Sequence, residues 1–243
     1  MRAELTAEFC RPHEGVDYTW RRRIFRWLLK TFVFTTVIKI KAEDVQNVPL
    51  TGGTIFIVNH TAFLEPVAVA GIVKRDDIVP MSKIENFKIP IVSWFVWNWG
   101  AFSVRRGQID RQALNYGVQV LDEGHAILMS PEGTRRPRLK RAHNGMAYMA
   151  SKANALVVPV AVAGADRFKV NLRRVRRTDL VMRFGRPFRF RPQDMPEGRV
   201  PRETLAEMTA EAMYQLAVLL PERLRGAYSN LEQMTTNHLL FED

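Results

Sequence analysis

The sequence contains very little cysteine and no long apolar run. Its single cysteine, Cys10, excludes an internal disulfide. No segment reaches the roughly 20 apolar residues that a bilayer-spanning helix needs. The segment 1–15 contains acidic residues and lacks the apolar stretch of a secretion signal. We therefore expect a chain without such a signal, which folds without disulfides in a reducing compartment and does not cross a membrane.

Several common catalytic signatures are also missing. The sequence has neither a Gly-X-Ser-X-Gly segment nor a Gly-X-X-X-X-Gly-Lys loop, which leaves a serine hydrolase and a P-loop enzyme unsupported. The five histidines do not show the spacing of zinc ligands, and one cysteine does not complete a zinc site. We expect no metal and no cofactor. The histidines are His13, His60, His125, His143 and His238.

Positive charge, in contrast, is in excess. The chain has 36 Lys and Arg against 25 Asp and Glu, a net charge of +11, and a pI near 10.2. Such an excess implies an anionic partner: a phosphate-bearing substrate, an anionic lipid surface or nucleic acid. The aromatic residues lie in apolar segments rather than on a basic platform, so we expect no nucleic acid. The composition, 47% hydrophobic and 25% charged, is typical of one globular domain with additions.

Two segments combine features that matter for membrane contact. In Tyr18–Val37, arginines alternate with aromatic and aliphatic residues, which predicts an amphipathic helix lying in the membrane interface. Ile89–Val104 has 16 residues without a charge and includes three tryptophans. It either meets a membrane interface or an acyl-chain pocket, or it forms a buried helix with a flanking loop. We expect an N-terminal tail and interfacial helix over 1–36 and an α/β domain with a C-terminal helix over 37–243.

Short apolar strands alternate with helical segments in the middle of the chain. Thr54–Val58, His125–Met129 and Ala155–Val162 are apolar runs bounded by turn residues. This alternation predicts an α/β fold with a mainly parallel central sheet flanked by helices. Val37–Ala42 alternates apolar residues with lysines, which indicates an edge strand. Pro159 cannot donate a ladder hydrogen bond and indicates an edge or bulge position for its strand.

A histidine follows the first of these strands. His60 comes after the apolar run, and Glu65 lies five residues later, before Pro66, which suits the first turn of a helix. Imidazole exchanges a proton near neutral pH, and a nearby carboxylate can orient it and stabilise its charged form. His60 and Glu65 are therefore a candidate base and its orienting acid. In the alternative interpretation His60 merely ends a strand and Glu65 only favours a helix N-terminus.

Two further strand ends carry charged groups. Arg105 and Arg106 follow one apolar strand, and another opens into Glu132, Gly133, Thr134 and Arg135. In a parallel sheet these ends lie along the same edge as His60. Arginine binds phosphate through paired hydrogen bonds, and glycine lets the backbone approach a ligand, with adjacent N–H groups as further donors. The combination suits acyl transfer to a hydroxyl of a phosphorylated polyol, whereas the alternative for the arginines is solvated charge.

Four blocks then occur in a recognisable order. They are NHTAFLEP at 59–66, GAFSVRRG at 100–107, SPEGTRR at 130–136 and VVPVAV at 157–162. They resemble the histidine-four-residues-aspartate block, the block ending in a phosphate-binding arginine, the Glu-Gly-Thr-Arg block and the proline block of the 1-acylglycerol-3-phosphate acyltransferases, also called lysophosphatidic acid acyltransferases. The resemblance covers residues 35 to 190, roughly.

The resemblance implies a peripheral enzyme on the cytoplasmic face of a membrane. It would take an acyl chain from acyl-CoA or acyl carrier protein and add it to a lysophospholipid, foremost 1-acyl-sn-glycerol-3-phosphate, giving phosphatidic acid. His60 would deprotonate the acceptor hydroxyl and Glu65 would orient the imidazole. Residues 18–37 would bring the site to the lipid, and the tryptophan-rich segment would line the acyl path. The acceptor's phosphate would be held by Arg105 or Arg106 with Glu132, Gly133, Thr134 and Arg135, where Glu132 positions Arg135 or the loop.

The chain departs from the family pattern at Glu65, where the usual residue is aspartate. A carboxylate that positions a base must hold it within about 0.5 Å of its productive position, and a misplacement of about 1 Å can cost roughly a hundredfold in rate.

Other functions remain open: acyl transfer to a lyso-aminolipid or glycolipid, or a non-catalytic protein that binds membranes or nucleic acid. For the arginine-rich segment 167–177 we expect solvated charge or contact with anionic lipid.

Overall fold

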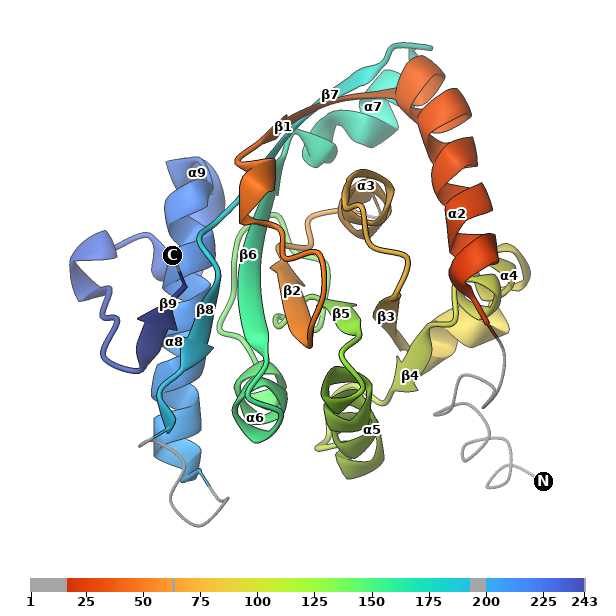
Figure 1. Cartoon of the computed structure of the whole chain (residues 1–243). Helices are drawn as coiled ribbons and strands as arrows, with labels where there is room; N and C mark the ends of the chain where they lie inside the picture. Colours follow the sequence, from red (N-terminus) through yellow and green to blue (C-terminus); the bar gives the residue numbers. More distant parts are fainter. Residues whose placement is uncertain (1–16, 63, 193–199, 243) are drawn as a thin grey trace.

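The computed structural model describes residues 17–62, 64–192 and 200–242, so Cys10 lies outside the described residues. The strands are β1 (Ile38–Glu43), β2 (Thr54–Val58), β3 (Ile78–Lys83), β4 (Phe102–Val104), β5 (Ala126–Met129), β6 (Leu156–Ala163), β7 (Thr178–Phe184), β8 (Phe188–Phe190) and β9 (Leu239–Phe241). The helices are α2 (Thr19–Leu28), α3 (Leu64–Ile72), α4 (Pro90–Asn98), α5 (Arg111–Asp122), α6 (Gly145–Lys152), α7 (Phe168–Arg173), α8 (Arg202–Leu219) and α9 (Glu222–Arg225) (Figure 1).

Five parallel strands form the centre of the sheet. The strand order is β1-β7-β6-β2-β5-β3-β4, and the strands from β6 to β4 all run in the same direction. β7 is antiparallel to β6, β1 is parallel to β7, and β8 joins β6 and β9 through antiparallel pairs. The predicted α/β fold with a mainly parallel sheet is confirmed.

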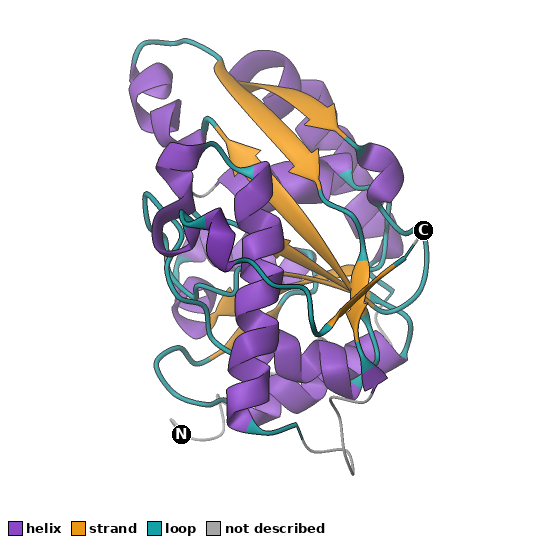
Figure 2. Cartoon of the chain, turned by 90° about the vertical axis from the view of Figure 1, so that its left-hand side faces the viewer, coloured by secondary structure: helices purple, strands orange, loops and turns teal. Residues whose placement is uncertain are grey.

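Helices cover both faces of this sheet. One apolar core joins the strands to α5, α6 and α8 and contains Ile57, while the other joins them to α3 and contains Phe56. In Figure 2 the strands lie between these helices. Consecutive residues of β2 thus enter opposite cores, and every residue of the strand is buried. A strand buried on both faces is what the continuous apolar run at 54–58 predicts.

The two predictions about sheet edges had different outcomes. β1 lies at the end of the strand order with Lys39 and Lys41 exposed, as expected for an edge strand. Of the edge or bulge position expected from Pro159, the edge is excluded, because β6 pairs with β2 on one side and with both β7 and β8 on the other. The bulge agrees with the register: Val157 is paired with Phe188 and Val160 with Phe184, so residues 158 and 159 lie opposite three residues, 185–187. Pro159 lies where β7 and β8 part, and its carbonyl accepts a hydrogen bond from the N–H of Gly185 at 2.8 Å. Because the nitrogen and carbonyl of a strand residue point to the same side, the missing N–H faces this gap and interrupts no ladder.

The helix predicted over Tyr18–Val37 is present and packs against the domain. α2 continues directly into a π-helix at Leu29–Val37. Arg22, buried in the contact, donates to the carbonyls of Asp76 and Trp99 at 2.9 and 3.0 Å, and Phe25 stacks on Trp99 with ring centroids 5.8 Å apart. At the other end of the helix, Phe34 packs against α3.

The outer side of the helix is apolar and exposed. Trp20, Ile24, Trp27 and Phe32 are each 48% to 60% exposed. α4 adds exposed Trp94 and Phe95, and its described residues include none that is buried, so the interpretation of this segment as a buried helix is wrong. Among the described residues, no helix is long and apolar enough to cross a membrane.

The C-terminal part follows the prediction and extends it. After β6 the chain forms β7 and β8 on either side of Gly185, and the expected C-terminal helix is α8. The sequence did not predict α9 and β9. Buried Glu211 of α8 accepts hydrogen bonds from the Thr235 hydroxyl and from the N–H groups of Asn237 and His238. This carboxylate holds the segment that returns to the sheet as β9.

At the amino edge of the sheet, one buried arginine joins three loops. Arg75 donates to the carbonyls of Gly52 and Gly124 at 3.0 and 3.1 Å and to the Thr54 hydroxyl at 3.0 Å. It also forms an ion pair with Asp77. The guanidinium therefore ties together the segments that precede β2, β3 and β5.

We expect Arg75→Ala to lower the free energy of unfolding by about 3 kcal/mol, because the buried carbonyls and Asp77 lose a charged partner. Urea unfolding followed by circular dichroism measures this loss. Arg202→Ala, at an exposed position on α8, serves as the control and should change stability by less than about 0.5 kcal/mol. Equal effects of the two substitutions would contradict the role given to Arg75.

Candidate active site

The three predicted strand ends lie along one edge of the sheet. His60 follows β2, Arg105 and Arg106 follow β4, and Glu132 follows β5, and these strands are parallel. A cavity of about 230 Å³ opens at this edge. The predicted residues that line it are His60, Arg106, Thr134 and Arg135. Glu65, Arg105, Glu132 and Gly133 are not part of its lining.

His60 and Glu65 form a buried pair at this edge. His60 Nδ1 lies 3.7 Å from Glu65 Oε2, and neither atom has a hydrogen-bond partner among the described residues. The separation is that of an ion pair, slightly longer than a hydrogen bond. Glu65 is completely buried, whereas the His60 side chain keeps 11% of its surface exposed. Glu65 is thus shielded from solvent, whereas the imidazole ring of His60 reaches the cavity.

The second oxygen of Glu65 organises the start of α3. Glu65 Oε1 accepts hydrogen bonds from the N–H groups of Thr61 and Ala62, at 2.9 and 2.7 Å, and from the Thr61 hydroxyl. Burial favours a higher pKa for Glu65, but His60 and these donors outweigh it and hold the pKa below its usual value. The carboxylate is therefore charged at neutral pH. It serves the helix terminus and the histidine together, so the two interpretations of Glu65 are not exclusive.

Glu132 holds the backbone of the site. Its two oxygens accept hydrogen bonds from the N–H of His60 at 3.3 Å and from the N–H of Lys140 at 2.9 Å. Burial raises its pKa to about 7, against these two donors, which lower it. The carboxyl group is 5% exposed and links the loop after β2 to both ends of the loop at 132–140. This geometry favours the loop-positioning role expected for Glu132.

Gly133 occupies a backbone conformation that side chains rarely adopt. Its φ is +70°, and a Cβ would lie 3.3 Å from Cδ2 of His143. Its N–H donates to the carbonyl of Ser130 at 3.1 Å. The N–H of Gly133 itself is therefore used inside the turn, and glycine is required here for the shape of the loop.

The two adjacent arginines after β4 differ in their surroundings. Arg106 lines the cavity, and burial lowers its pKa; neighbouring Glu85 opposes this change and Arg135 reinforces it. The N–H of Arg105 donates to Asp110 at 2.9 Å. Asp110 also caps α5 by accepting a hydrogen bond from the N–H of Ala113. Of the two arginines, Arg106 is thus the one that faces the cavity.

Arg135 lies between the histidine and the cavity. Its Nε–H donates to His60 Nε2 at 3.4 Å, and the next residue, Arg136, donates its backbone N–H to the His60 carbonyl at 3.0 Å. Since Nδ1 faces Glu65, Nε2 is the ring nitrogen that is directed to the cavity. A guanidinium thus lies beside the nitrogen that would accept a proton.

Two cavity residues were not predicted from the sequence. Lys83 ends β3 and Asn86 lies in the 3-10 helix Ile84–Lys88 that follows it. Asn86 donates to the hydroxyl of Ser82 at 2.9 Å, which fixes its side chain. The sequence feature that could have identified Lys83 is its position after an apolar run, which it shares with the residues at the other strand ends. Lys83, Arg106 and Arg135 bring three cationic groups to one small cavity.

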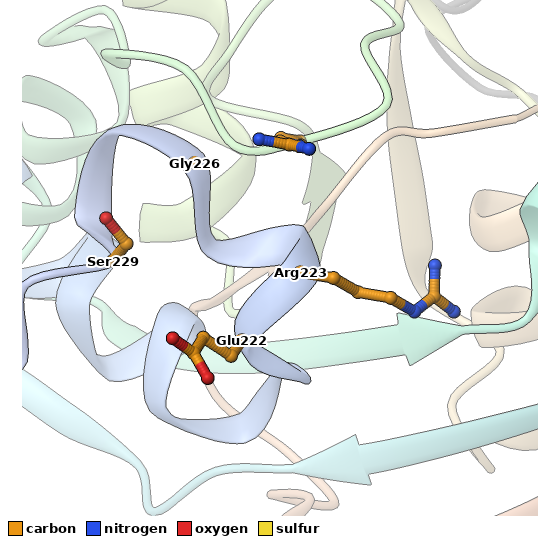
Figure 3. A pocket seen from close by; sticks show the side chains of 5 residues that line it. Glu222, Arg223, Gly226 and Ser229 are labelled. Carbon is orange, nitrogen blue, oxygen red and sulfur yellow. The ribbon is translucent and has the colours of Figure 1, made fainter.

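A larger cavity, of about 390 Å³, lies elsewhere in the fold. It is lined by Arg138, Glu222, Arg223, Gly226 and Ser229, and Figure 3 shows the last four on the successive turns of α9 and the 3-10 helix after it. It shares no residue with the cavity at His60. Within the described part of the chain, no group of three His, Cys, Asp or Glu side chains is arranged to hold a metal ion.

A sequence model of the family described as "Acyltransferase" matches residues 39–163, just over half of the chain. The chain belongs to the acyltransferase family. The matched range includes His60, Glu65 and all the residues that line the cavity beside them. The N-terminal helix and the elements from α7 onward lie outside this range.

Related acyltransferases are similar over part of their length. The chain is 28% identical over 134 residues to the 1-acyl-sn-glycerol-3-phosphate acyltransferase of Streptococcus pneumoniae, covering 55% of this chain and 49% of that protein. It is 31% identical over 116 residues to such an enzyme of Chlamydomonas reinhardtii, covering 45% and 34%. A lyso-ornithine lipid O-acyltransferase of Pseudomonas aeruginosa is 24% identical over 154 residues, with coverages of 61% and 57%. The chain thus spans roughly half or less of the first two relatives.

The fold has a counterpart of known structure. The crystal structure of the 1-acyl-sn-glycerophosphate (LPA) acyltransferase of Thermotoga maritima aligns with a TM-score of 0.54, covering 90% of this chain and 79% of the other. The sequence identity is 20%, so this likeness concerns the fold.

The raised pKa of Glu132 makes stability depend on pH. The folded chain holds this proton up to about pH 7, whereas an unfolded glutamate releases it near 4.3, roughly. Stability from this group is therefore fully present at low pH and is lost as pH rises through about 7.

We expect the free energy of unfolding of the wild type to fall relative to that of Glu132→Gln as pH rises across this interval, because glutamine does not titrate. Urea unfolding at a series of pH values measures the difference between the two proteins. Parallel stability profiles would show that Glu132 has an ordinary pKa.

Proposed function

We propose that this protein is an O-acyltransferase that moves a fatty acyl group from acyl-CoA or acyl carrier protein to the free hydroxyl of a lysophospholipid. The observation that carries the proposal is the buried His60–Glu65 pair at a cavity with three cationic side chains. The favoured acceptor is 1-acyl-sn-glycerol-3-phosphate, which gives phosphatidic acid; the Streptococcus pneumoniae and Chlamydomonas reinhardtii relatives are named for this acceptor.

In the proposed reaction His60 is the general base. Its Nε2 takes the proton of the acceptor hydroxyl while the oxygen attacks the carbonyl carbon of the thioester. The tetrahedral intermediate then expels the thiolate, which takes the proton from the imidazolium, so an ester and a free thiol are formed. Glu65 stabilises the imidazolium through Nδ1 in the interval. Shortening their 3.7 Å separation by less than 1 Å, roughly, would give a charge-assisted hydrogen bond.

The cationic cavity suits a phosphate monoester. Lys83 is the last residue of β3, and Arg106 and Arg135 lie in the loops after the neighbouring strands β4 and β5, so they approach a bound group from different directions. Their mutual repulsion is relieved when a dianion binds among them. We propose that Arg135 turns from His60 to this phosphate, which releases the lone pair of Nε2 when the acceptor is in place.

We also propose a peripheral location on the cytoplasmic face of a membrane. The helix at residues 18–37 and α4 would contact lipid through their exposed aromatic residues, and the tail and helix at 1–36 would act as a membrane element of the α/β domain at 37–243. Phe87, next to the cavity residue Asn86, packs on Trp97 of α4 with ring centroids 5.8 Å apart. α4 is thus well placed to guide an acyl chain from the lipid to the site.

A second acceptor class is favoured by the Pseudomonas aeruginosa relative, which is named for a lyso-ornithine lipid. The ornithine head group carries a carboxylate, which the same cations can bind. An acceptor panel that includes a lyso-glycolipid, assayed with acyl-CoA and with acyl carrier protein as donors, separates these possibilities.

We expect His60→Ala to lower kcat by about a thousandfold, since a positioned general base contributes roughly 10²–10⁴. Glu65→Asp should lower kcat about a hundredfold, because a shorter side chain cannot reach His60 and the Thr61 and Ala62 N–H groups together. We expect this loss although aspartate is the usual acid of the family. Acyl transfer by purified variants with unchanged circular dichroism measures both effects. Full activity of His60→Ala would contradict the mechanism, and a faster Glu65→Asp would contradict the geometry given to Glu65.

The adjacent arginines provide a matched pair. Arg106→Gln should raise KM for 1-acyl-sn-glycerol-3-phosphate about tenfold to a hundredfold with little change in kcat, because it removes a charged hydrogen bond to the phosphate. Arg105→Gln carries the same charge change one position away and should alter KM by less than about threefold. Steady-state kinetics of both variants measure the two KM values. Equal KM values for the two would place the phosphate elsewhere.

A further inference from the structure

The turn after α7 is strongly basic and carries exposed aliphatic side chains. We call residues 167–177 the basic tip. Its cations are all exposed: Arg167, Lys169, Arg173, Arg174, Arg176 and Arg177. Val170 and Leu172 are half exposed, and Val175 is 96% exposed. The flanking acids are Asp166, which pairs with Arg223, and Asp179.

Val175 is exposed and has a backbone conformation that valine rarely adopts. Its φ is +52°, a left-handed conformation that is a genuine outlier for a β-branched residue. Around Asn171 the turn is closed by hydrogen bonds: its carbonyl accepts the N–H of Arg176 at 2.9 Å and its side chain donates to the Thr178 hydroxyl at 3.2 Å. The N–H of Val175 donates to Leu172 at 3.1 Å. A fully exposed valine in a strained, hydrogen-bonded turn is unfavourable in water, which points to another environment.

The basic tip lies at the same edge of the sheet as His60. β6 runs parallel to β2, and Asn59, next to His60, is hydrogen-bonded through its side chain to Val162 near the end of β6; α7 follows that end. The Arg177 guanidinium donates to the carbonyls of Phe34 and Ile38 at 2.8 and 3.2 Å. The tip therefore adjoins the end of the N-terminal helix, where Phe32 is exposed, and Figure 1 shows α7 close to that end.

We propose that the basic tip is a second membrane contact, which binds the head groups of anionic lipids and places Val175 in the interface. Cations around an aliphatic side chain match a surface with negative charge outside and hydrocarbon beneath. The described part of the tip has no exposed aromatic residue on which bases could stack, which disfavours nucleic acid. This inference goes beyond acyl transfer, because it concerns the lipid composition that the protein selects.

The test compares two charge-matched double variants of the full chain. Arg173→Gln/Arg176→Gln removes two charges from the basic tip, and Lys152→Gln/Arg202→Gln removes two exposed charges from α6 and α8. Sedimentation is measured with vesicles of phosphatidylcholine alone and of phosphatidylcholine with phosphatidylglycerol. The tip variant should lose about thirtyfold in affinity for the anionic vesicles and little for the neutral ones, whereas the control changes neither markedly. Equal losses in the two variants would overturn the proposal.

Val175→Gly separates membrane contact from structure. Glycine accepts a positive φ, so this variant should unfold no more readily than the wild type and yet bind anionic vesicles about fivefold more weakly. Unchanged vesicle binding by this variant, or tighter salt-sensitive binding of the wild type to nucleic acid than to anionic vesicles, would reject the assignment. Because no acyl donor is present, failure of the proposed acyl transfer leaves this result unaffected.

Discussion

Parallel pairing around β2 is the constraint on which the site depends. β2 is hydrogen-bonded to β5 on one side and to β6 on the other, and the three strands are parallel, so all of them end at the same edge of the sheet. Their loops are then joined by Asn59 to β6, by Glu132 to the N–H of His60, and by the N–H of Arg136 to the His60 carbonyl. The histidine is held by the loop after β5 and, through its neighbour Asn59, by β6. Its position is therefore set by the sheet and does not rely on the flexibility of a single turn.

Glu65 has two roles at the same edge of the sheet. One oxygen satisfies N–H groups at the start of α3, and the other faces His60. A helix N-terminus favours a negative charge, which helps to keep this fully buried carboxylate ionised. The glutamate side chain is long enough to make both contacts at once, so the fold holds His60 and Glu65 as an ordered pair.

Strand positions and ends were predictable because apolar runs buried on both faces stop abruptly where the chain reaches the edge, as at Val58 before His60. The identity of the cavity-facing arginine was not, because Arg105 and Arg106 are chemically identical neighbours and only the folded structure shows that Arg106 lines the cavity. Lys83 went unassigned because its strand is only partly buried. The interior position of Pro159 depends on a gap between β7 and β8, which involves residues distant in sequence.

Charge distribution connects the cavity with the wider surface. Burial raises the pKa of Glu132 to about 7, so near neutral pH this acid cancels less of the positive potential than a solvated glutamate would. Arg106 and Arg135 repel each other, and burial adds to the cost of keeping Arg106 charged. Because these cations repel each other, the cavity is stabilised when an anionic head group replaces water among them. The exposed arginines that follow β6 place further positive charge at the same edge. In the functions proposed above, membrane binding and recognition of the acceptor would therefore draw on one region of positive charge, which the parallel strands organise.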